Sequence, residues 1–402
     1  MKTGVTILFI FLINTFGYVA VKAQPVQQHF KVSYFGDTLE IPTNGPLQVK
    51  LQQPVNEQAL KEFYSGLLKK DFQPLINSLL DYRKEKQLDD WLFYQLIRRT
   101  AQQLSPKADN YERYTLYKWY FLVRCGYNAQ LAFVHDKLLF YVQSDENIYD
   151  IPLFTLEGKQ YVCLNIHDFG KIDFEKDKLQ KVDLPVIGAE QPFSYRVRQI
   201  PDIKTSTYAE KLLVFNYKNA EDQYKVRFNP NLEKMFINYP SVDFETYFNI
   251  PLSRETYGSL IPGLKKKLGS MKQERGIDYL MHFTRHAFMF QTDQENFGKE
   301  KRLSPEQTLL NSKSDCDDRA ALFYYLVKEI YNLPMIVLVY PSHVTVALEL
   351  ENPVGTPIVY KGKKFSVCEP TPQRLDLPVG RLMPELDAVA YQVAYEYIPS
   401  VQ

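Results

Sequence analysis

The chain has 402 residues, more than a single hydrophobic core normally fills, so we expect two or three domains. Its 48 basic and 47 acidic residues nearly cancel, which argues against a nucleic-acid-binding protein, because that class carries a basic surface. Hydrophobic residues at 45% and aromatic residues at 14% exclude a disordered chain and favour β-rich cores.

The first 23 residues are typical of a secretory signal peptide. Lys2 gives a positive start, an apolar stretch runs from Val5 to Ala20, and small residues precede a cleavage position after Ala23. No later stretch is apolar enough to span a bilayer. We therefore expect a periplasmic or secreted protein with no membrane span after signal cleavage.

Residues 24–171 are predicted to form an N-terminal α+β domain. A strand-like start at Phe30–Ile41 is followed by helical periodicity over Asn56–Leu104 and by a helix at Tyr114–Cys125. Alternating hydrophobicity then predicts three strands, with a turn between the second and third at Glu157-Gly158. The three strands are Gln130–Val134, Leu138–Val142 and Gln160–Leu164.

The rest of the chain divides into a β-rich connector domain, 172–252, and a C-terminal α+β domain, 253–402. Strand-like pieces in the connector are Ser194–Ile200, Lys211–Tyr217 and Tyr224–Phe228. The helices predicted in the C-terminal domain are Leu264–Gln273, Ile277–Phe290 and Asp317–Tyr331. Its predicted strands are Met335–Tyr340, Val344–Leu350 and Lys364–Cys368, with a hairpin turn at Lys361-Gly362.

Four cysteines in an exported chain of this length do not make a disulfide framework, and their spacing does not match a zinc site. Cys125 ends an apolar helix, while Cys163 and Cys368 lie in strand-like runs, so these three are interpreted as core residues. Cys316 differs because it lies among acidic residues at a predicted helix start. The helix dipole there favours a thiolate, so Cys316 is the candidate nucleophile.

Two further residues have positions that suit a catalytic triad. Pro341-Ser342 ends one predicted strand and His343 opens the next. Glu369 closes the strand after that, which Pro370 then stops. If these two strands are antiparallel, Glu369 lies opposite the strand start that carries His343. A carboxylate there would orient the imidazole and stabilise its charged form.

These residues resemble the transglutaminase-like (papain-like) superfamily, in which a Cys at a helix start precedes a strand-opening His and a strand-ending Asp-x-Thr. The matching runs are Ser314-Asp315-Cys316-Asp317-Asp318-Arg319, His343-Val344-Thr345 and Cys368-Glu369-Pro370-Thr371. The resemblance implies a catalytic domain with Cys316 as nucleophile, His343 as base and Glu369 as the orienting acid. The sequence departs from the pattern in having Glu rather than Asp, and in lacking an aromatic residue after His343.

The resemblance further implies acyl transfer through a thioester and no cofactor. In an aqueous extracytoplasmic compartment we expect hydrolysis, hence a protease or amidase whose substrate is a peptide or protein amide, a cell-wall peptide included. The backbone N–H of Cys316 would bind the oxyanion, with a second donor from Ile277–Phe290 or from Gln291. The alternative is a non-catalytic binding or scaffold protein built on transglutaminase-like domains.

An internal similarity at an offset of 204 residues links the two ends of the chain. It pairs Tyr120, Leu122, Val123, Tyr127, Asn128 and Gly158 with Tyr324, Leu326, Val327, Tyr331, Asn332 and Gly362. One interpretation is an inactive copy of the catalytic domain, and the other is a chance match between apolar patterns. At this offset Cys316, His343 and Glu369 fall on Glu112, Leu139 and Asn165, so a copy would lack the thiol and the imidazole.

His282 and His286 are spaced so that both face the same side of a helix and could hold a metal ion. The run between them lacks the glutamate of the zinc-protease motif, and the sequence shows no third ligand. We therefore predict no metal site here.

Overall fold

The computed structural model describes residues 28–400 apart from Lys171, Glu175, Ile187, Lys204, Ser206, Lys299, Gln373 and Leu375. The predicted signal peptide, residues 1–23, lies outside these described residues. Within them, no helix has the length and apolar character needed to cross a membrane. The architecture is α+β and contains two five-stranded sheets.

The first half opens with a hairpin and four helices: the strand-like start predicted over Phe30–Ile41 is a hairpin, and the helical periodicity over Asn56–Leu104 covers three helices. These elements are β1 (Gln28–Tyr34), β2 (Asp37–Thr43), α1 (Glu57–Leu68), α2 (Gln73–Lys86), α3 (Asp90–Leu104) and α4 (Tyr111–Arg124). Helix α1 begins where the Asn56 side chain accepts a hydrogen bond from the backbone N–H of Ala59, a standard N-cap. Helices α3 and α4 are buried on most sides because they pack against each other and against β1 and β3.

The first sheet follows α4 and is antiparallel throughout, in the order β6-β7-β4-β3-β8. Its strands are β3 (Ala129–Val134), β4 (Lys137–Gln143), β6 (Leu153–Leu156), β7 (Lys159–Cys163) and β8 (Gln180–Val182), with the short 3₁₀ helix η1 (Ile166–Asp168) after β7. Glu157 and Gly158, at φ 51° and 75°, make the tight turn predicted between β6 and β7.

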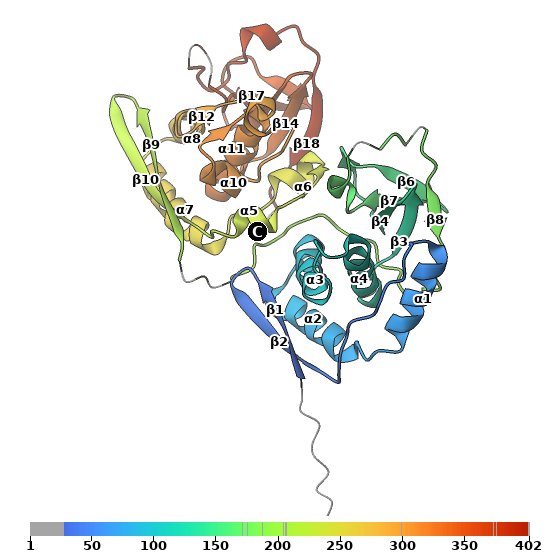
Figure 1. The fold of residues 1–402 in the computed structure, drawn as a ribbon. Helices are drawn as coiled ribbons and strands as arrows, with labels where there is room; N and C mark the ends of the chain where they lie inside the picture. Colours follow the sequence, from blue (N-terminus) through green and yellow to red (C-terminus); the bar gives the residue numbers. More distant parts are fainter. Residues whose placement is uncertain are drawn as a thin grey trace, which may run out of the picture.

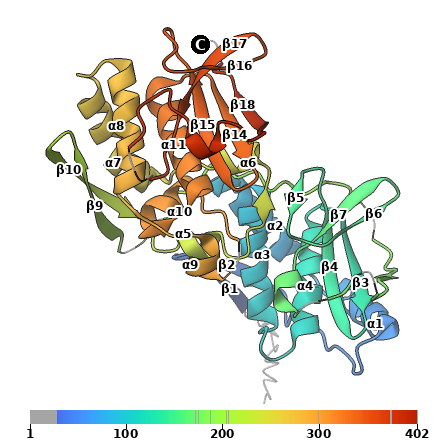
Figure 2. The ribbon, with the colours of Figure 1, turned by 90° about the horizontal axis from the view of Figure 1, so that it is seen from above.

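The segment expected as a connector domain, 172–252, contributes strands to three different sheets. It gives β8 to the first sheet, while its hairpin of β9 (Ala209–Tyr217) and β10 (Ala220–Phe228) packs against helices of the second half. Figures 1 and 2 show this hairpin at the edge of the molecule beside α7 and α8. Its remaining elements are α5 (Leu232–Met235), β11 (Ser241–Val242), which pairs with β5 (Ile148–Tyr149), and α6 (Phe244–Phe248).

The strand expected over Ser194–Ile200 is absent, and the reason is local. Carboxylates take the place of a neighbouring strand: the backbone N–H of Ser194 donates to Asp90 at 2.9 Å, and that of Tyr195 donates to Glu146 at 2.7 Å. The segment joins no ladder, although Tyr195, Val197 and Ile200 are buried.

The second half begins with two helices and ends with the second sheet. Its helices are α7 (Arg254–Leu268), α8 (Gln273–His286), α9 (Asp293–Phe297), α10 (Pro305–Leu310), α11 (Cys316–Tyr331) and the 3₁₀ helix η2 (Pro384–Leu386). Its strands are β12 (Met289–Phe290), β13 (Lys313–Ser314), β14 (Met335–Tyr340), β15 (His343–Glu349), β16 (Ile358–Tyr360), β17 (Lys363–Cys368) and β18 (Gln392–Tyr397). The sheet order is β16-β17-β15-β14-β18, all antiparallel.

The two sheets have corresponding strand orders, and a helix comes immediately before each sheet in the chain. Strands β6, β7, β4, β3 and β8 match β16, β17, β15, β14 and β18 one for one, and α4 precedes the first sheet as α11 precedes the second (Figure 1). The pairing of β4 with β7 beside α4, on which the similarity depended, is present. A common origin of the halves remains a prediction.

The structure changes which residues correspond. The β3–β4 hairpin of the first sheet corresponds to the β14–β15 hairpin of the second. At its turn Val134 pairs with Lys137, just as Tyr340 pairs with His343 in the second sheet. Lys137, and not Leu139, therefore occupies the position of His343. Likewise the first residue of α4 is Tyr111, where α11 begins with Cys316. A fixed offset of 204 therefore does not hold across the whole unit.

In the first half, the corner that matches the triad is closed by hydrogen bonds. The side-chain amide of Asn165 donates to the Tyr111 hydroxyl at 2.8 Å and to the Leu138 carbonyl at 2.9 Å. Its oxygen accepts from the backbone N–H of Phe140 at 2.8 Å. Asn165 is fully buried, so these contacts satisfy a polar group that would otherwise be costly to bury.

Candidate active site

Cys316 is the first residue of α11, directly after the short strand β13. Strand β13 pairs in parallel with β12, and the backbone N–H of Gln291 donates to the Ser314 carbonyl at 3.2 Å. These contacts fix the backbone that leads into the helix. Among the four cysteines, Cys316 is partly exposed, while Cys125, Cys163 and Cys368 are buried.

His343 opens β15, which is the central strand of the sheet rather than an edge strand. Strand β17 runs antiparallel beside it, with Cys368 opposite Val346, and this places Glu369 near the start of β15 as predicted. His343 Nε2 lies 2.8 Å from Glu369 Oε2. The other carboxylate oxygen accepts the backbone N–H of Thr371 at 2.8 Å, so Glu369 is held at both oxygens.

The thiol of Cys316 lies against the same strand start. The backbone N–H of Val344, the residue after His343, lowers the pKa of this thiol, and helix α11 packs against β15. Helix α11, which begins with Cys316, therefore lies beside the strand that begins with His343, and this histidine is bound to Glu369. Because the Glu369 carboxylate accepts the proton on His343 Nε2, the Nδ1 atom is the one left free to act as a base.

The electrostatics around the thiol differ from the expectation of a thiolate. Burial raises the pKa of Cys316 well above its ordinary value, and the carboxylates of Asp317 and Asp315 raise it further. The Val344 N–H lowers this pKa but does not reverse the shift. The resting site is therefore expected to hold a neutral thiol.

Several carboxyl groups are buried near the start of α11. Burial raises the pKa of Asp315, the neighbouring Asp317 raises it further, and burial raises the pKa of Asp293 to about 7. Asp318, also raised well above its usual pKa by burial, accepts from the backbone N–H of Leu303 at 2.7 Å and from the Tyr247 hydroxyl at 2.9 Å. These bonds tie Asp318 to the loop before α10, so it does not compete with Glu369 for His343.

Arg319 was missed as a functional residue by the sequence analysis. It is fully buried, and its Nη1 atom donates to the carbonyls of Thr284 and Arg285 at 2.7 and 2.8 Å. The remaining guanidinium nitrogens donate to the carbonyls of Phe288 and Ser314 at 3.1 and 3.4 Å. Arg319 thus satisfies the last-turn carbonyls of α8 and joins that helix to the residues just before Cys316.

A cavity of about 470 Å³ lies beside the second sheet, lined among others by Tyr340, Val367, Leu382 and Tyr391. None of the three triad residues lines it. Tyr340 is the cross-strand neighbour of His343, however, so the cavity begins one strand away from the base. Gln291, one of the two sources predicted for a second oxyanion donor, lies next to β13.

The sequence shows no third ligand beside His282 and His286, but the structure places one there. A third residue, Asp376, lies close to both imidazoles, and the three ligand atoms are within 4.8 Å of one another. The sequence could not show this because Asp376 is 90 residues from His286 along the chain. Two acidic groups beside the thiol, Asp315–Cys316–Asp317 and Asp293–Glu300–Asp315, are also close enough to share an ion.

Cys316 is expected to be the thiol that iodoacetamide labels, and the labelling rate should rise with pH. Because its pKa is raised, the thiolate fraction grows about tenfold per pH unit between pH 7 and 9. Asp317→Asn removes a negative neighbour, lowers that pKa and should speed labelling at pH 8 roughly 3- to 10-fold. Peptide mapping by mass spectrometry measures both effects.

Glu57→Gln, on an exposed helix far from the thiol in sequence, is the matched charge control and should leave the labelling rate unchanged. Preferential labelling of Cys125, Cys163 or Cys368 would contradict the assignment of the reactive thiol. A rate that stays constant below pH 7 would instead indicate a preformed thiolate–imidazolium pair.

Comparisons of the chain with protein-family models, with curated proteins and with solved structures each returned no match.

Proposed function

We propose that the chain is a cysteine-dependent acyl-transfer enzyme that hydrolyses amide bonds of a peptide or protein, cell-wall peptides included. The observation that carries the proposal is the 2.8 Å contact between His343 Nε2 and Glu369 Oε2, beside a thiol at a helix start. The order of these residues and their strand contexts also support membership of the transglutaminase-like superfamily. The reach of Glu369 to the imidazole supports its use in place of the usual, shorter Asp.

The chemistry begins from a neutral thiol. As the Cys316 sulfur attacks the carbonyl carbon of the amide, His343 Nδ1 takes the thiol proton, and Glu369 stabilises the resulting imidazolium. The first-turn N–H groups of α11, Cys316 included, point toward the developing oxyanion. When the C–N bond breaks, His343 returns the proton to the leaving amine and a thioester remains on Cys316.

Water completes the reaction. His343 removes a proton from the water molecule that attacks the thioester carbonyl, and the C–S bond breaks as the thiolate is reprotonated. The products are a carboxylic acid and the free thiol of Cys316. An amine in place of water would give transamidation through the same thioester, so the triad permits either acceptor.

The second candidate is a non-catalytic binding or scaffold protein with a transglutaminase-like fold. It is favoured by the raised pKa of Cys316 and by the cavity beside the sheet, which none of the triad residues lines. On this alternative the cavity near Tyr340 would bind a partner segment, and Cys316 would be an unused thiol.

Incubation with p-nitrophenyl acetate tests the proposal without knowledge of the natural substrate. The wild-type chain should release about one nitrophenolate per protein in an initial burst and gain one acetyl group on Cys316, as covalent catalysis requires. Cys316→Ala should lose both. If the folded wild type forms no acetyl-Cys316 even at pH 9, where the thiolate fraction is larger, the binding-protein alternative is favoured.

A further inference from the structure

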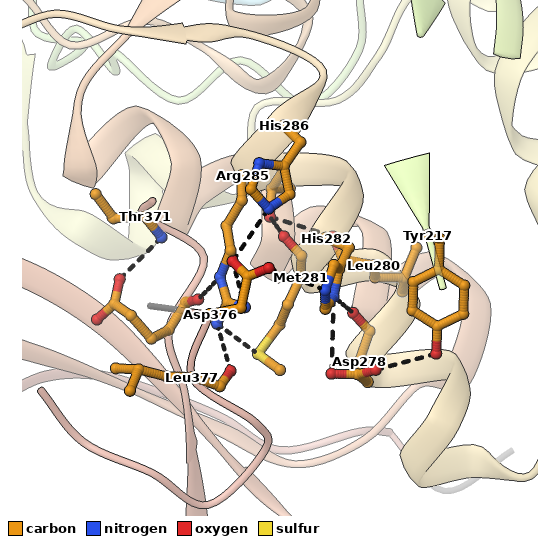
Figure 3. A network of polar contacts seen from close by, with 12 residues as sticks. Tyr217, Asp278, Leu280, Met281, His282, Arg285, His286, Thr371, Asp376 and Leu377 are labelled. Atoms are coloured by element: carbon orange, nitrogen blue, oxygen red, sulfur yellow. Dashed lines mark hydrogen bonds and ion pairs between the residues drawn. The ribbon is translucent and has the colours of Figure 1, made fainter. Parts of the chain in front are cut away.

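A second cluster of functional side chains lies on α8, outside the triad. His282 and His286 extend from consecutive turns of this helix, and Asp376 reaches them from the loop that follows β17 (Figure 3). His286 Nε2 lies 3.1 Å from Asp376 Oδ1, and His282 Nε2 lies 3.4 Å from Asp376 Oδ2. One carboxylate therefore faces two imidazoles.

The tautomer of His282 follows from its other ring nitrogen. Nδ1 lies 3.0 Å from the backbone carbonyl of Asp278, and a carbonyl oxygen can only accept, so Nδ1 carries the proton. In a neutral ring Nε2 then presents a lone pair toward a carboxylate oxygen. Two acceptors at 3.4 Å repel each other unless a proton or a cation lies between them. A backbone carbonyl on the far nitrogen is also the usual way in which a protein orients a metal-binding histidine.

The separations from the carboxylate to each imidazole are close to those in a small coordination sphere. Ligands 2.0–2.1 Å from a tetrahedral zinc ion are about 3.3 Å apart. Asp376 Oδ1 is 3.1 Å from His286, Asp376 Oδ2 is 3.4 Å from His282, and one ligand atom from each of the three residues lies within 4.8 Å of the others. Two imidazoles and one carboxylate are ligands that suit Zn²⁺ and other first-row dications. The side chains of His286 and Asp376 are 38% and 45% exposed, so an ion can enter and keep a water ligand.

Arg285 lies between the two histidines in sequence, and its guanidinium donates hydrogen bonds to backbone carbonyls. Its Nε donates to the Glu369 carbonyl and its Nη2 to the Leu377 carbonyl, both at 2.7 Å. Its Nη1 is 3.7 Å from Asp376, too far for a hydrogen bond, so both carboxylate oxygens remain directed at the histidines. The guanidinium charge opposes a bound dication, and we expect weaker binding than at a closed structural zinc site.

We propose that His282, His286 and Asp376 bind one divalent transition-metal ion, with Zn²⁺ the best chemical match. The ion would fasten the loop after β17 to α8. This loop begins at Glu369, whose carbonyl already accepts a hydrogen bond from Arg285. The role is structural, and it does not depend on the proposed acyl-transfer reaction.

The full chain, stripped of metal with EDTA and dialysed, is titrated with Zn²⁺ by calorimetry. We expect one ion per chain with a dissociation constant below about 100 µM. The melting temperature should rise with Zn²⁺, because a ligand that binds only the folded state stabilises it. His282→Ala and His286→Ala should each weaken binding at least about tenfold and abolish the Zn²⁺-dependent rise. Asp376→Asn, which keeps both imidazoles, should also weaken binding.

His135→Ala is the matched control. His135 also pairs with a carboxylate, its Nε2 lying 2.8 Å from Asp177, but no second histidine belongs to a metal-binding group there among the described residues. The His135→Ala variant should bind Zn²⁺ with the same affinity as the wild type. If His282→Ala binds like the wild type, or if Cys316→Ser loses the ion instead, the proposal is overturned. It is also overturned if the metal-free wild type does not bind Zn²⁺, since an imidazolium paired with Asp376 would then account for the cluster.

Discussion

His343→Ala is expected to lower the rate of acyl transfer by about 10²–10⁴, to the level of Cys316→Ala, because it removes the group that takes and returns the proton. The geometry supports this size of effect, since the imidazole is held by Glu369 at 2.8 Å, while the carboxyl groups of Asp315 and Asp317 beside the thiol raise its pKa. The measurement is the rate of nitrophenolate release, with acetylation of Cys316 followed by mass spectrometry.

Glu369→Gln should retain more activity than His343→Ala. A glutamine oxygen can still accept the proton of His343 Nε2, but it supplies no charge to stabilise the imidazolium. Glu369→Asp keeps the charge and shortens the side chain, so comparing the two variants separates charge from reach. If Glu369→Gln is silent while Asp318→Asn abolishes activity, the third member of the triad has been assigned wrongly.

Arg319→Met is expected to destabilise the fold by about 3–5 kcal/mol, the largest loss of stability we predict. The side chain is fully buried and donates to four backbone carbonyls, which would lose their partners at once. Methionine fills much of the volume, so the loss measures polar contacts more than packing. Urea unfolding followed by circular dichroism gives the free energy of unfolding.

Arg254→Met serves as the matched control for Arg319→Met. Arg254 pairs with Asp202 at 2.9 Å, but its side chain is 80% exposed, so the change should stay within about 0.5 kcal/mol. Arg319→Lys keeps the positive charge but lacks the planar guanidinium group, so its loss of stability should lie between those of Arg319→Met and Arg254→Met. Equal stability of Arg319→Met and Arg254→Met would show that the carbonyls of α8 find other partners.

The elements that carry the candidate triad could be predicted from sequence because each has a strong local signal. Acidic residues mark the start of α11, Pro341-Ser342 marks the turn before His343, and Pro370 stops β17 after Glu369. Strand β14 has the predicted bounds, and the β15–β17 pairing follows from hairpin connectivity. Local chemistry and short-range topology were sufficient for the placement of these three residues.

The features that were missed depend on contacts between distant residues or on broken patterns. Helix α7 begins at Arg254, ten residues before the predicted start, because Pro262 within the helix obscured its periodicity. The contacts of Arg319 with α8 and of Asp376 with His286 span 34 and 90 residues, so no sequence window contains both partners. The carboxyl groups that oppose a thiolate at Cys316 were visible in sequence, but their burial was not.

The two sheets correspond in strand order, but the matching corners differ in how well their buried polar groups are hydrogen-bonded. In the first half, the corner around Asn165 has its hydrogen bonds made, because the side-chain amide of Asn165 is bonded to Tyr111, Leu138 and Phe140. In the second half, two carboxyl oxygens at the start of α11 are unfavourably buried. Asp315 Oδ1 and Asp318 Oδ2 have no hydrogen-bond partner among the described residues. Unfavourable burial of this kind is typical of sites kept for chemistry rather than for stability. The start of α11 therefore carries a cost in stability that the corner around Asn165 does not.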